Sequence, residues 1–393
     1  MVAFLWLGLN CLLLATVSAS IPGADPTGRV DSSAALNAAI RSLCNGTVFL
    51  EANVNTYAVP SIARSVVLDL EGGVYRMDAP LTVDRTVRCT GKLRVRDGTL
   101  LAGQPLGKLG NHSFLVTVLE YWGGLGVSLE HIVFANNGTG GGLRVDSAHH
   151  VHVTDSVFVN FATVGVWGSA LLGMGHDLVV DRCRLTECTL PMAQCADINK
   201  KTATAIVIDF PDSHFRNTVI TCGKAGVLNR ASSNVFHELH IWPSCTGDAP
   251  FGPNNTVALA DESGGGTRIS GCYFDNSVVR ITGYRGTTLT NSLFNGGARL
   301  ELAPSVQPGT PSPSATDCQY WKGAVCSLII KNNQFLCGKM GCAVFNISYG
   351  FTQAAQVYVE SNAFENASTC TTGGRHSCAG AEDCERLLGP CPP

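Results

Sequence analysis

Residues 269–274, Ile-Ser-Gly-Cys-Tyr-Phe, carry the pattern that decides the fold. A short strand ends on a large apolar residue, and a second apolar residue stands five positions earlier. The pattern occurs nine times, with successive end residues 20 to 41 positions apart. A minimum spacing of 20 residues, with extra residues inserted between some of the repeats, is typical of a coil of parallel strands. The extra residues loop out at a corner of the coil. The end residues are Phe134, Phe158, Leu185, Ile220, Ile241, Phe274, Phe294, Phe335 and Phe364, and the residues five positions earlier are Leu129, Val153, Val180, Phe215, Phe236, Ile269, Leu289, Ile330 and Val359.

The composition agrees with many short strands joined by turns. The chain has 393 residues, of which 45% are hydrophobic, 15% are charged and 43 are glycine. This hydrophobic content supports a large buried core, so the chain is not a disordered segment. The net charge is −3 and the sequence contains no run of Lys or Arg. The chain therefore lacks the basic surface with which proteins bind nucleic acids. We therefore expect one elongated domain with no nucleic-acid partner.

The N-terminus has the features of a signal peptide over residues 1–19. An apolar stretch from Val2 to Val17 leads into a small-residue cleavage pattern that ends at Ala19. Cleavage there would remove Cys11 from the 17 cysteines and leave an even number, which suits an oxidising compartment. No later stretch is apolar over the length of a membrane-spanning helix, so we expect a secreted, extracellular protein. Six sequons predict N-glycosylation, at Asn45, Asn111, Asn137, Asn254, Asn346 and Asn366.

Three segments outside the repeat differ from it in composition. Residues 31–43 place a capping Asp-Ser-Ser before an apolar stripe of helical period, which predicts one N-terminal capping helix. Residues 303–317 contain four prolines and predict an extruded loop. Residues 366–393 form a cysteine-rich tail. Eight cysteines lie between Cys318 and Cys391, and we expect them to staple the C-terminal end.

Cys183 and Cys272 take the same inward position in the repeat, three coils apart. At ~4.8 Å per coil this separation is roughly 14 Å, which exceeds the limit of about 7 Å between the Cα atoms of a disulfide. We therefore expect each of these two cysteines to be free or to be bonded elsewhere.

The opening segment Gly-Ala-Asp-Pro-Thr-Gly (residues 23–28), with the helical stretch 34–40 behind it, resembles the cap of the pectate-lyase-like, right-handed parallel β-helix superfamily. Later motifs, such as Asp-Gly-Thr-Leu at 97–100 and His-Ile-Trp at 240–242, are similar to a largely uncharacterised secreted branch of it. The resemblance implies an all-β fold, a single-stranded right-handed parallel β-helix, over residues 20–365.

The resemblance implies a fold more firmly than a reaction, because the superfamily contains lyases, hydrolases, epimerases and binding proteins. The Asn-Thr-Asp, Asp-Asp, Gly-His-Gly and Arg-Ile-Lys motifs of polygalacturonase-type members do not occur in this sequence. The Arg-x-Pro-x-x-Arg pattern of one pectate lyase group is absent as well. The catalytic residues of those members therefore cannot be carried over.

The repeat still predicts which side chains leave the coil together. Residues immediately before and after each inward end residue should share an outer face. On two neighbouring coils these residues are His240, Trp242, Tyr273 and Asp275, and Arg184 shares the face two coils earlier. A sugar ring needs an aromatic surface for its C–H face and directional polar groups for its hydroxyls, and this set provides both.

We considered three functions for this face and favour an enzyme, with a polysaccharide lyase first. In β-elimination on a uronate-containing polysaccharide, His240 or Tyr273 would remove the proton beside the carboxylate, and Arg184 or a bound cation would neutralise that carboxylate. Asp275 completes the predicted catalytic group, with Trp242 as a substrate contact. The structural alternative is that the two aromatic residues pack beneath a loop and Asp275 caps a turn.

Hydrolysis is the second enzymatic option, and it needs two carboxyl groups about 5 to 9.5 Å apart. Asp275 has no acidic neighbour at the equivalent position of either adjacent coil, so Asp261, Glu262 or Glu301 would have to approach it from elsewhere. The option from a different class is a non-catalytic glycan-binding or cell-surface structural protein. In each case we expect a monomer whose partner is a polysaccharide.

A second outward stripe lies four and six positions before the end residues. Its mixture of imidazole, carboxylate and guanidinium groups could bind a sulfated or carboxylated chain. A metal site is not predicted, because His149 and His150 should face opposite sides of a strand, and no motif identifies a cofactor, although a cation such as Ca²⁺ remains open. The stripe comprises His152, Asp181, His214, Arg216, His237 and Arg268.

Overall fold

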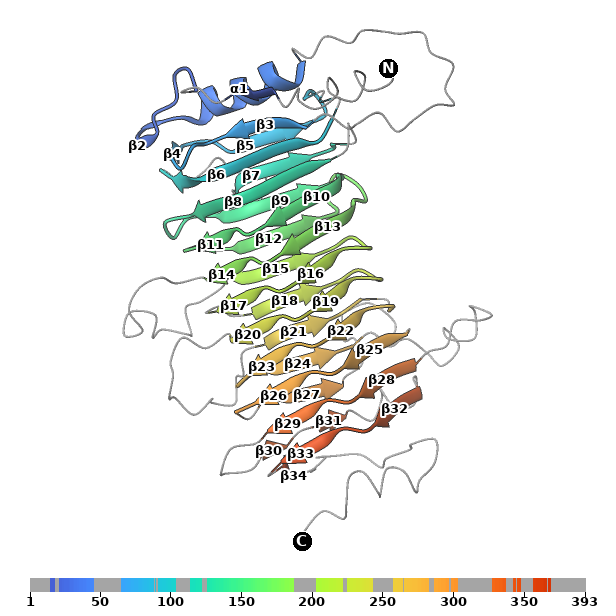
Figure 1. Cartoon of the computed structure of the whole chain (residues 1–393). Coiled ribbons are helices and arrows are strands. Elements are labelled where there is room, and N and C mark those ends of the chain that lie inside the picture. The colour runs from blue at the N-terminus through green and yellow to red at the C-terminus, as the bar shows by residue number, and fades with distance from the viewer. Residues whose placement is uncertain are drawn as a thin grey trace, which may run out of the picture.

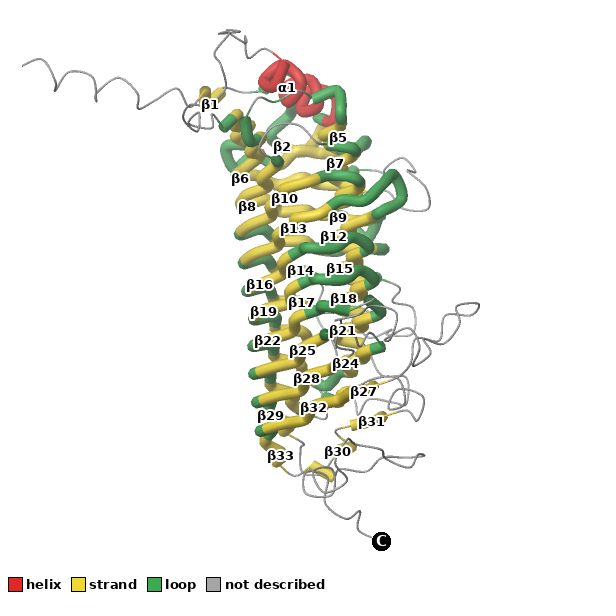
Figure 2. The backbone as a smooth tube through the Cα atoms, turned by 90° about the vertical axis from the view of Figure 1, so that its right-hand side faces the viewer, coloured by secondary structure: helices red, strands yellow, loops and turns green. Residues whose placement is uncertain are grey.

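The computed structural model shows one long coil with helix α1 (Ser33–Asn45) at its N-terminal end (Figures 1 and 2). Strands stack along the whole length of the coil, and successive coils lie beside each other (Figure 2). Among the described residues, no helix is long and apolar enough to cross a membrane. The structure describes residues 15–17, 21–45, 65–87, 89, 91–103, 114–121, 126–186, 203–221, 225–242, 257–263, 265–282, 286–296, 298–302, 327–336, 342–343, 345–347, 356–365 and 367–368.

The described strands form two large parallel sheets and one small one. The 22-stranded sheet contains β1 (Ala15–Val17), β2 (Thr27–Asp31), β3 (Val66–Asp69), β4 (Val74–Met77), β6 (Leu93–Ala102), β8 (Val127–Ala135), β10 (His149–Thr154), β11 (Val157–Val159), β13 (His176–Asp181), β14 (Arg184–Thr186), β16 (His214–Arg216), β17 (Val219–Thr221), β19 (Val235–His237), β20 (His240–Trp242), β22 (Arg268–Ser270), β23 (Tyr273–Asp275), β25 (Thr287–Thr290), β26 (Leu293–Asn295), β28 (Ser327–Lys331), β29 (Gln334–Leu336), β32 (Gln356–Glu360) and β33 (Ala363–Glu365). The 10-stranded sheet contains β5 (Leu81–Asp84), β7 (Phe114–Leu119), β9 (Gly141–Asp146), β12 (Val164–Ser169), β15 (Thr204–Ile208), β18 (Ala225–Asn229), β21 (Val257–Asp261), β24 (Val278–Ile281), β27 (Arg299–Leu302) and β31 (Phe345–Ile347). Strands β30 (Cys342–Ala343) and β34 (Ala367–Ser368) form the small sheet.

The register predicted from the repeat is confirmed on every coil. The nine end residues pair in one continuous column from Phe134 to Phe364. The apolar residues five positions earlier pair in a second column from Leu129 to Val359. End residues from Phe134 to Phe335 are at most 2% exposed. The fold is therefore the right-handed parallel β-helix, with a narrow apolar interior that runs along its length.

Two backbone bends recur at fixed positions in the repeat, and the sequence did not reveal them. Three positions before the end residue, φ is +51° to +64° on each coil from Asp97 to Ser361. Eight positions before it, φ is again positive on seven successive coils, at Gly126, His150, Asp177, Asp212, Ser233, Gly266 and Gly286. A left-handed residue turns a strand sharply, so it directs its neighbours differently from the strict alternation of a flat strand. The first column is Asp97, His131, Asp155, Arg182, Asn217, Glu238, Gly271, Asn291, Asn332 and Ser361.

Helix α1 covers the first coil, as the sequence predicted. Its Leu36 and Ile40 are fully buried against the interior of the coil. The Asp31 carboxylate accepts a hydrogen bond from the Ser33 backbone amide (3.0 Å) at the start of the helix. Cys44, near the helix end, forms a disulfide with Cys89. The helix thus caps the open apolar end of the solenoid and is tied to it covalently.

Several predicted features lie outside the described residues. These are the 303–317 loop, the tail from residue 366 apart from β34, and the side chains of every predicted glycosylation site except Asn137. Asn137 is exposed in the turn that follows β8, which is compatible with glycan attachment. Strand β1 lies within residues 1–19 and pairs with β3 in this chain. The proposed domain boundaries and the signal peptide stay predictions.

Cys183 and Cys272 are both free and buried, in agreement with the disulfide argument. Their thiols face the interior, where Cys183 Sγ donates to the Asp181 carbonyl (3.3 Å) and Cys272 Sγ to the Ser270 carbonyl (3.5 Å). Burial raises the pKa of each thiol to about 12. The reactive thiolate is therefore strongly disfavoured at neutral pH.

We expect iodoacetamide to leave Cys183 and Cys272 unmodified in the native protein and to alkylate both after denaturation without reductant. Burial excludes the reagent and holds the thiols in their protonated form. Peptide mass spectrometry measures the modification at each cysteine. Alkylation of either residue in the native protein at the rate of an exposed thiol would contradict this expectation.

Replacing Phe274 with alanine should destabilise the coil by about 3–5 kcal/mol, because a fully buried ring is removed from a close-packed column. Phe274 packs against Phe294 with ring centroids 5.0 Å apart. Urea unfolding followed by circular dichroism measures the loss. The control is Val30→Ala in β2, where the side chain is 64% exposed and the change should stay within about 0.5 kcal/mol. Equal losses in the free energy of unfolding for the two variants would contradict the idea that the column of buried rings stabilises the coil.

Candidate functional site

The candidate site lies on β20 and β23, which are neighbours in the larger sheet. His240 pairs with Tyr273, and Ile241 pairs with Phe274. Because Ile241 and Phe274 are fully buried, the residues beside them point out of the coil. The prediction that His240, Tyr273 and Asp275 share an outer face is therefore confirmed.

The three side chains are in direct contact. The His240 ring stacks on the Tyr273 ring, with centroids 4.6 Å apart and planes 21° apart. His240 Nε2 lies 3.1 Å from Asp275 Oδ2. The histidine side chain is 38% exposed and the aspartate side chain 15% exposed. The geometry therefore gives an accessible imidazole that is held by an aromatic ring and a carboxylate.

Asn295, on β26, connects the other two groups, and the sequence analysis missed this role. Its Nδ2 donates to Tyr273 Oη (2.9 Å) and to Asp275 Oδ1 (2.8 Å). Asn295 pairs with Asp275 across neighbouring strands, so its position in the repeat was the available signal. The amide fixes the carboxylate so that its other oxygen faces His240.

The protonation of Tyr273 follows from its surroundings. Burial raises the pKa of this phenol, and the hydrogen bond and negative charge of Asp275 raise it further, while the hydrogen bond from Asn295 lowers it. The phenol is therefore protonated at neutral pH and can donate a proton. This arrangement favours His240 over Tyr273 as the base of the pair.

Trp242 and Arg184 lie on the same face but take different positions. Trp242 ends β20, pairs with Thr221 and is partly exposed. Arg184 is exposed on β14, and Val219 stands between it and His240 in the column. Two strand spacings, roughly 10 Å, therefore separate Arg184 from His240, so Arg184 would meet a different part of an extended ligand.

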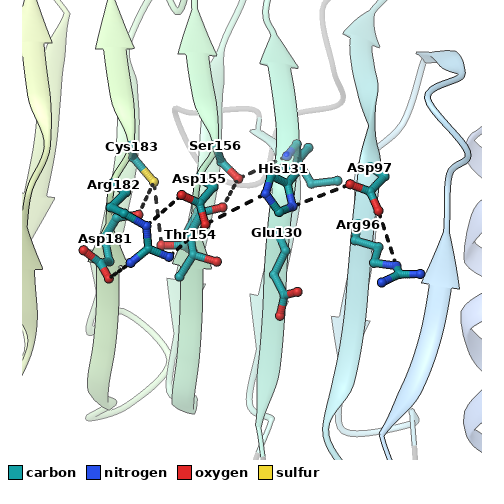
Figure 3. Close-up of polar contacts among 12 residues, drawn as sticks. Arg96, Asp97, Glu130, His131, Thr154, Asp155, Ser156, Asp181, Arg182 and Cys183 are labelled. Carbon is teal, nitrogen blue, oxygen red and sulfur yellow. Dashed lines mark hydrogen bonds and ion pairs between the residues drawn. The ribbon is translucent and has the colours of Figure 1, made fainter. Parts of the chain in front are cut away.

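Two residues of the second stripe, Asp181 and Arg216, adjoin a ladder of ion-pair contacts along the first bend. Figure 3 shows Arg182 between Asp155 and Asp181, and His131 between Asp155 and Asp97. Arg182 contacts Asp155 at 2.8 Å and Asp181 at 2.7 Å, and His131 Nδ1 lies 3.5 Å from Asp97. Carboxylates thus alternate with an imidazole or a guanidinium on these successive coils.

Asp181 is the most enclosed member of that stripe. Its side chain is only 4% exposed, and its oxygens also contact Arg216 (3.2 Å) and Asn217 (2.9 Å). The exposed guanidinium groups of Arg182 and Arg216 are therefore better placed than Asp181 to meet a ligand. His237 contacts Ser270 Oγ (2.9 Å) on the next strand. His214 is exposed on β16, two strands from His152.

The carboxylates considered for hydrolysis lie elsewhere. Asp261 is fully buried in the interior, where it accepts from Asn229 (2.8 Å), and burial raises the pKa of its carboxyl group. Glu301 is held by Arg280 and Arg299 on the smaller sheet. Neither residue forms a carboxylate pair with Asp275.

The Tyr273 phenol should titrate above its usual range, and Asp275→Asn should move its pKa down toward the ordinary value of about 10. Asn295→Ala should move the pKa further up, because it removes the one contact that stabilises the phenolate. NMR of ¹³Cζ-labelled tyrosine measures both shifts, with Tyr273→Phe to assign the signal. Shifts of the same sign in the two variants would contradict this description of the site.

Comparisons with known proteins support the fold. No family model and no curated protein matches the sequence. Among solved structures, PfbA, a surface adhesin of Streptococcus pneumoniae, is 12% identical with a TM-score of 0.52, and the match covers 92% of this chain and 91% of PfbA. Geobacillus virus E2 ORF18 is also 12% identical with a TM-score of 0.52, over 90% of this chain, which spans 60% of that protein. The chain is thus similar in fold to both proteins at low sequence identity, and the parallel sheets of its described strands show that this fold is a parallel β-helix.

Proposed function

We propose that this chain is a secreted protein that binds an acidic, uronate-containing polysaccharide and cleaves it by β-elimination. The observation that carries the proposal is the contact of His240 with both Asp275 and Tyr273 on an outer face of the coil. A partly exposed tryptophan on the same strand adds an apolar surface for a sugar ring. The signal-peptide pattern supports an extracellular location.

In the proposed reaction, His240 takes the proton from the carbon beside the uronate carboxylate. The electron pair of that C–H bond forms the new C=C double bond, and the C–O bond to the neighbouring sugar breaks. The Tyr273 phenol donates its proton to the departing oxygen. Asp275 orients the imidazole and stabilises its charged form, and Asn295 holds Asp275 in place.

The developing charge on the uronate also requires a nearby cation. Arg184 is two coils away and would bind another carboxylate of the same polymer. We therefore expect the reaction to depend on an added divalent cation such as Ca²⁺. Ca²⁺ is a hard cation that prefers oxygen ligands, and the carboxylates and hydroxyls of the polymer supply such ligands.

Binding without catalysis is the second candidate function. Its support is the exposed guanidinium groups of Arg182 and Arg216, which are 54% and 51% exposed and which Asp181 holds in place. Such a row can bind carboxylates or sulfates along an extended chain. PfbA, which has a similar fold, is a surface adhesin.

The decisive assay incubates the purified protein with acidic polysaccharides and Ca²⁺ and follows the ultraviolet absorbance of unsaturated uronate products. His240→Ala should lower kcat by about 10²–10⁴ while KM changes little, because a general base acts in the transition state. The matched control is His131→Asn, which removes an exposed imidazole from the ion-pair ladder and should retain full turnover. No absorbing product from any acidic glycan would overturn β-elimination. Retained, salt-sensitive binding in that case would identify the binding function.

A further inference from the structure

Four ligand-type side chains meet on β10 and β13, away from the site described above. His149 pairs with His176 across the two strands, and His150 and Asp177 follow them in sequence. These residues lie eight and nine positions before the end residues of their coils, at the second bend. His240 lies one position before the end residue of a later coil. The four residues and His240 are therefore on different strands and at different positions of the repeat.

The prediction that His149 and His150 face opposite sides of the strand is wrong, because the backbone bends at His150. Successive side chains face opposite sides only in an extended strand. His150 has φ +53° and Asp177 has φ +59°, so both are left-handed. The bend brings the rings of His149 and His150 to 6.3 Å. Gly126 occupies the equivalent place on the preceding coil with φ +93°, where a Cβ would collide with the His150 backbone oxygen.

The donor atoms of this cluster are already close together. Asp177 Oδ2 lies 2.6 Å from His176 Nδ1 and 3.2 Å from His150 Nδ1. The His149 and His176 rings make an edge contact with centroids 3.5 Å apart. Around a tetrahedral ion with metal–nitrogen bonds of about 2.0–2.1 Å, ligand atoms are roughly 3.3 Å apart. The Asp177 oxygen therefore lies close to one ring nitrogen on each of two histidines, as a shared metal ion would require.

We propose that His149, His150, His176 and Asp177 bind a divalent transition metal ion of the Zn²⁺, Cu²⁺ and Ni²⁺ class. Imidazole nitrogens select these borderline ions over Ca²⁺ and Mg²⁺, which prefer oxygen. In the rotamers of the described residues, no group of three or more His, Cys, Asp or Glu side chains is placed so that it could hold a metal ion. Binding therefore requires the proton to leave each ligating nitrogen and the rings to rotate. Exposure of 55% for His150, 39% for His176 and 36% for Asp177 leaves them room to do so.

The test titrates metal-stripped protein, with its disulfides intact, with Zn²⁺ in an isothermal calorimeter. We expect one saturable site per chain that Asp177→Asn and His150→Asn each weaken at least 10-fold. Asparagine tolerates the left-handed backbone of both positions, so these variants should fold. His131→Asn is the matched control, because His131 is also a left-handed histidine between carboxylates (φ +54°). Its affinity for Zn²⁺ should equal that of the wild type.

X-ray absorption of the zinc-loaded protein identifies the ligands. Scattering typical of imidazole, without a sulfur shell, is expected, and it should weaken in His176→Ala. Absence of a saturable site, an equal loss of affinity in the control, or sulfur ligation would each overturn the proposal. Neither measurement depends on catalysis, so the metal site can fail or succeed independently of the lyase proposal.

Discussion

The structure depends on the stacking of inward apolar side chains in register from coil to coil. A single coil cannot bury its own apolar face, so each gains its core only from the coils above and below it. Large rings meet directly in the column, with centroids 4.1 Å apart for Phe134 and Phe158 and 4.5 Å for Phe294 and Phe335. A shift of one residue would turn the column outward, so this contact fixes the register of every strand. The outward columns, including the candidate site, follow from it.

Much of this arrangement could be predicted from sequence because the repeat has a period and a fixed polarity. The end residues gave the register from Phe134 to Phe364, and the register placed His240 beside Tyr273. The bends could not be predicted, because their left-handed residues share no composition. Arg182, Glu238 and His131 adopt this conformation in the same column as Gly271. Glycine and asparagine are the usual signals for it, and on these coils the packing of the column imposes the bend instead.

The candidate site could likewise be predicted only in part from the sequence pattern. Periodicity assigns a residue to a face, but it says nothing about rotamers, so the link from Asn295 to Tyr273 and Asp275 was not predictable. Periodicity also assigned Arg184 to the correct face, but it did not show how far Arg184 lies from His240 along the coil. The protonation of Tyr273 depends on both burial and hydrogen bonding. A chemical role could be assigned to it only once those contacts were known.

The in-register stacking also limits where function can lie on the outside. Equivalent side chains of neighbouring coils are held about one strand spacing apart, roughly 4.8 Å, so like charges in one column would repel strongly. Along the first bend the chain meets this constraint by placing Asp97, His131, Asp155 and Arg182 in turn, so that each carboxylate has an imidazole or a guanidinium beside it. The column of His240 and Tyr273 meets it differently, by stacking two aromatic rings. The imidazole of His240 is 38% exposed beside this stacked ring. The column therefore leaves a side chain open to solvent, whereas the first bend commits its polar side chains to one another.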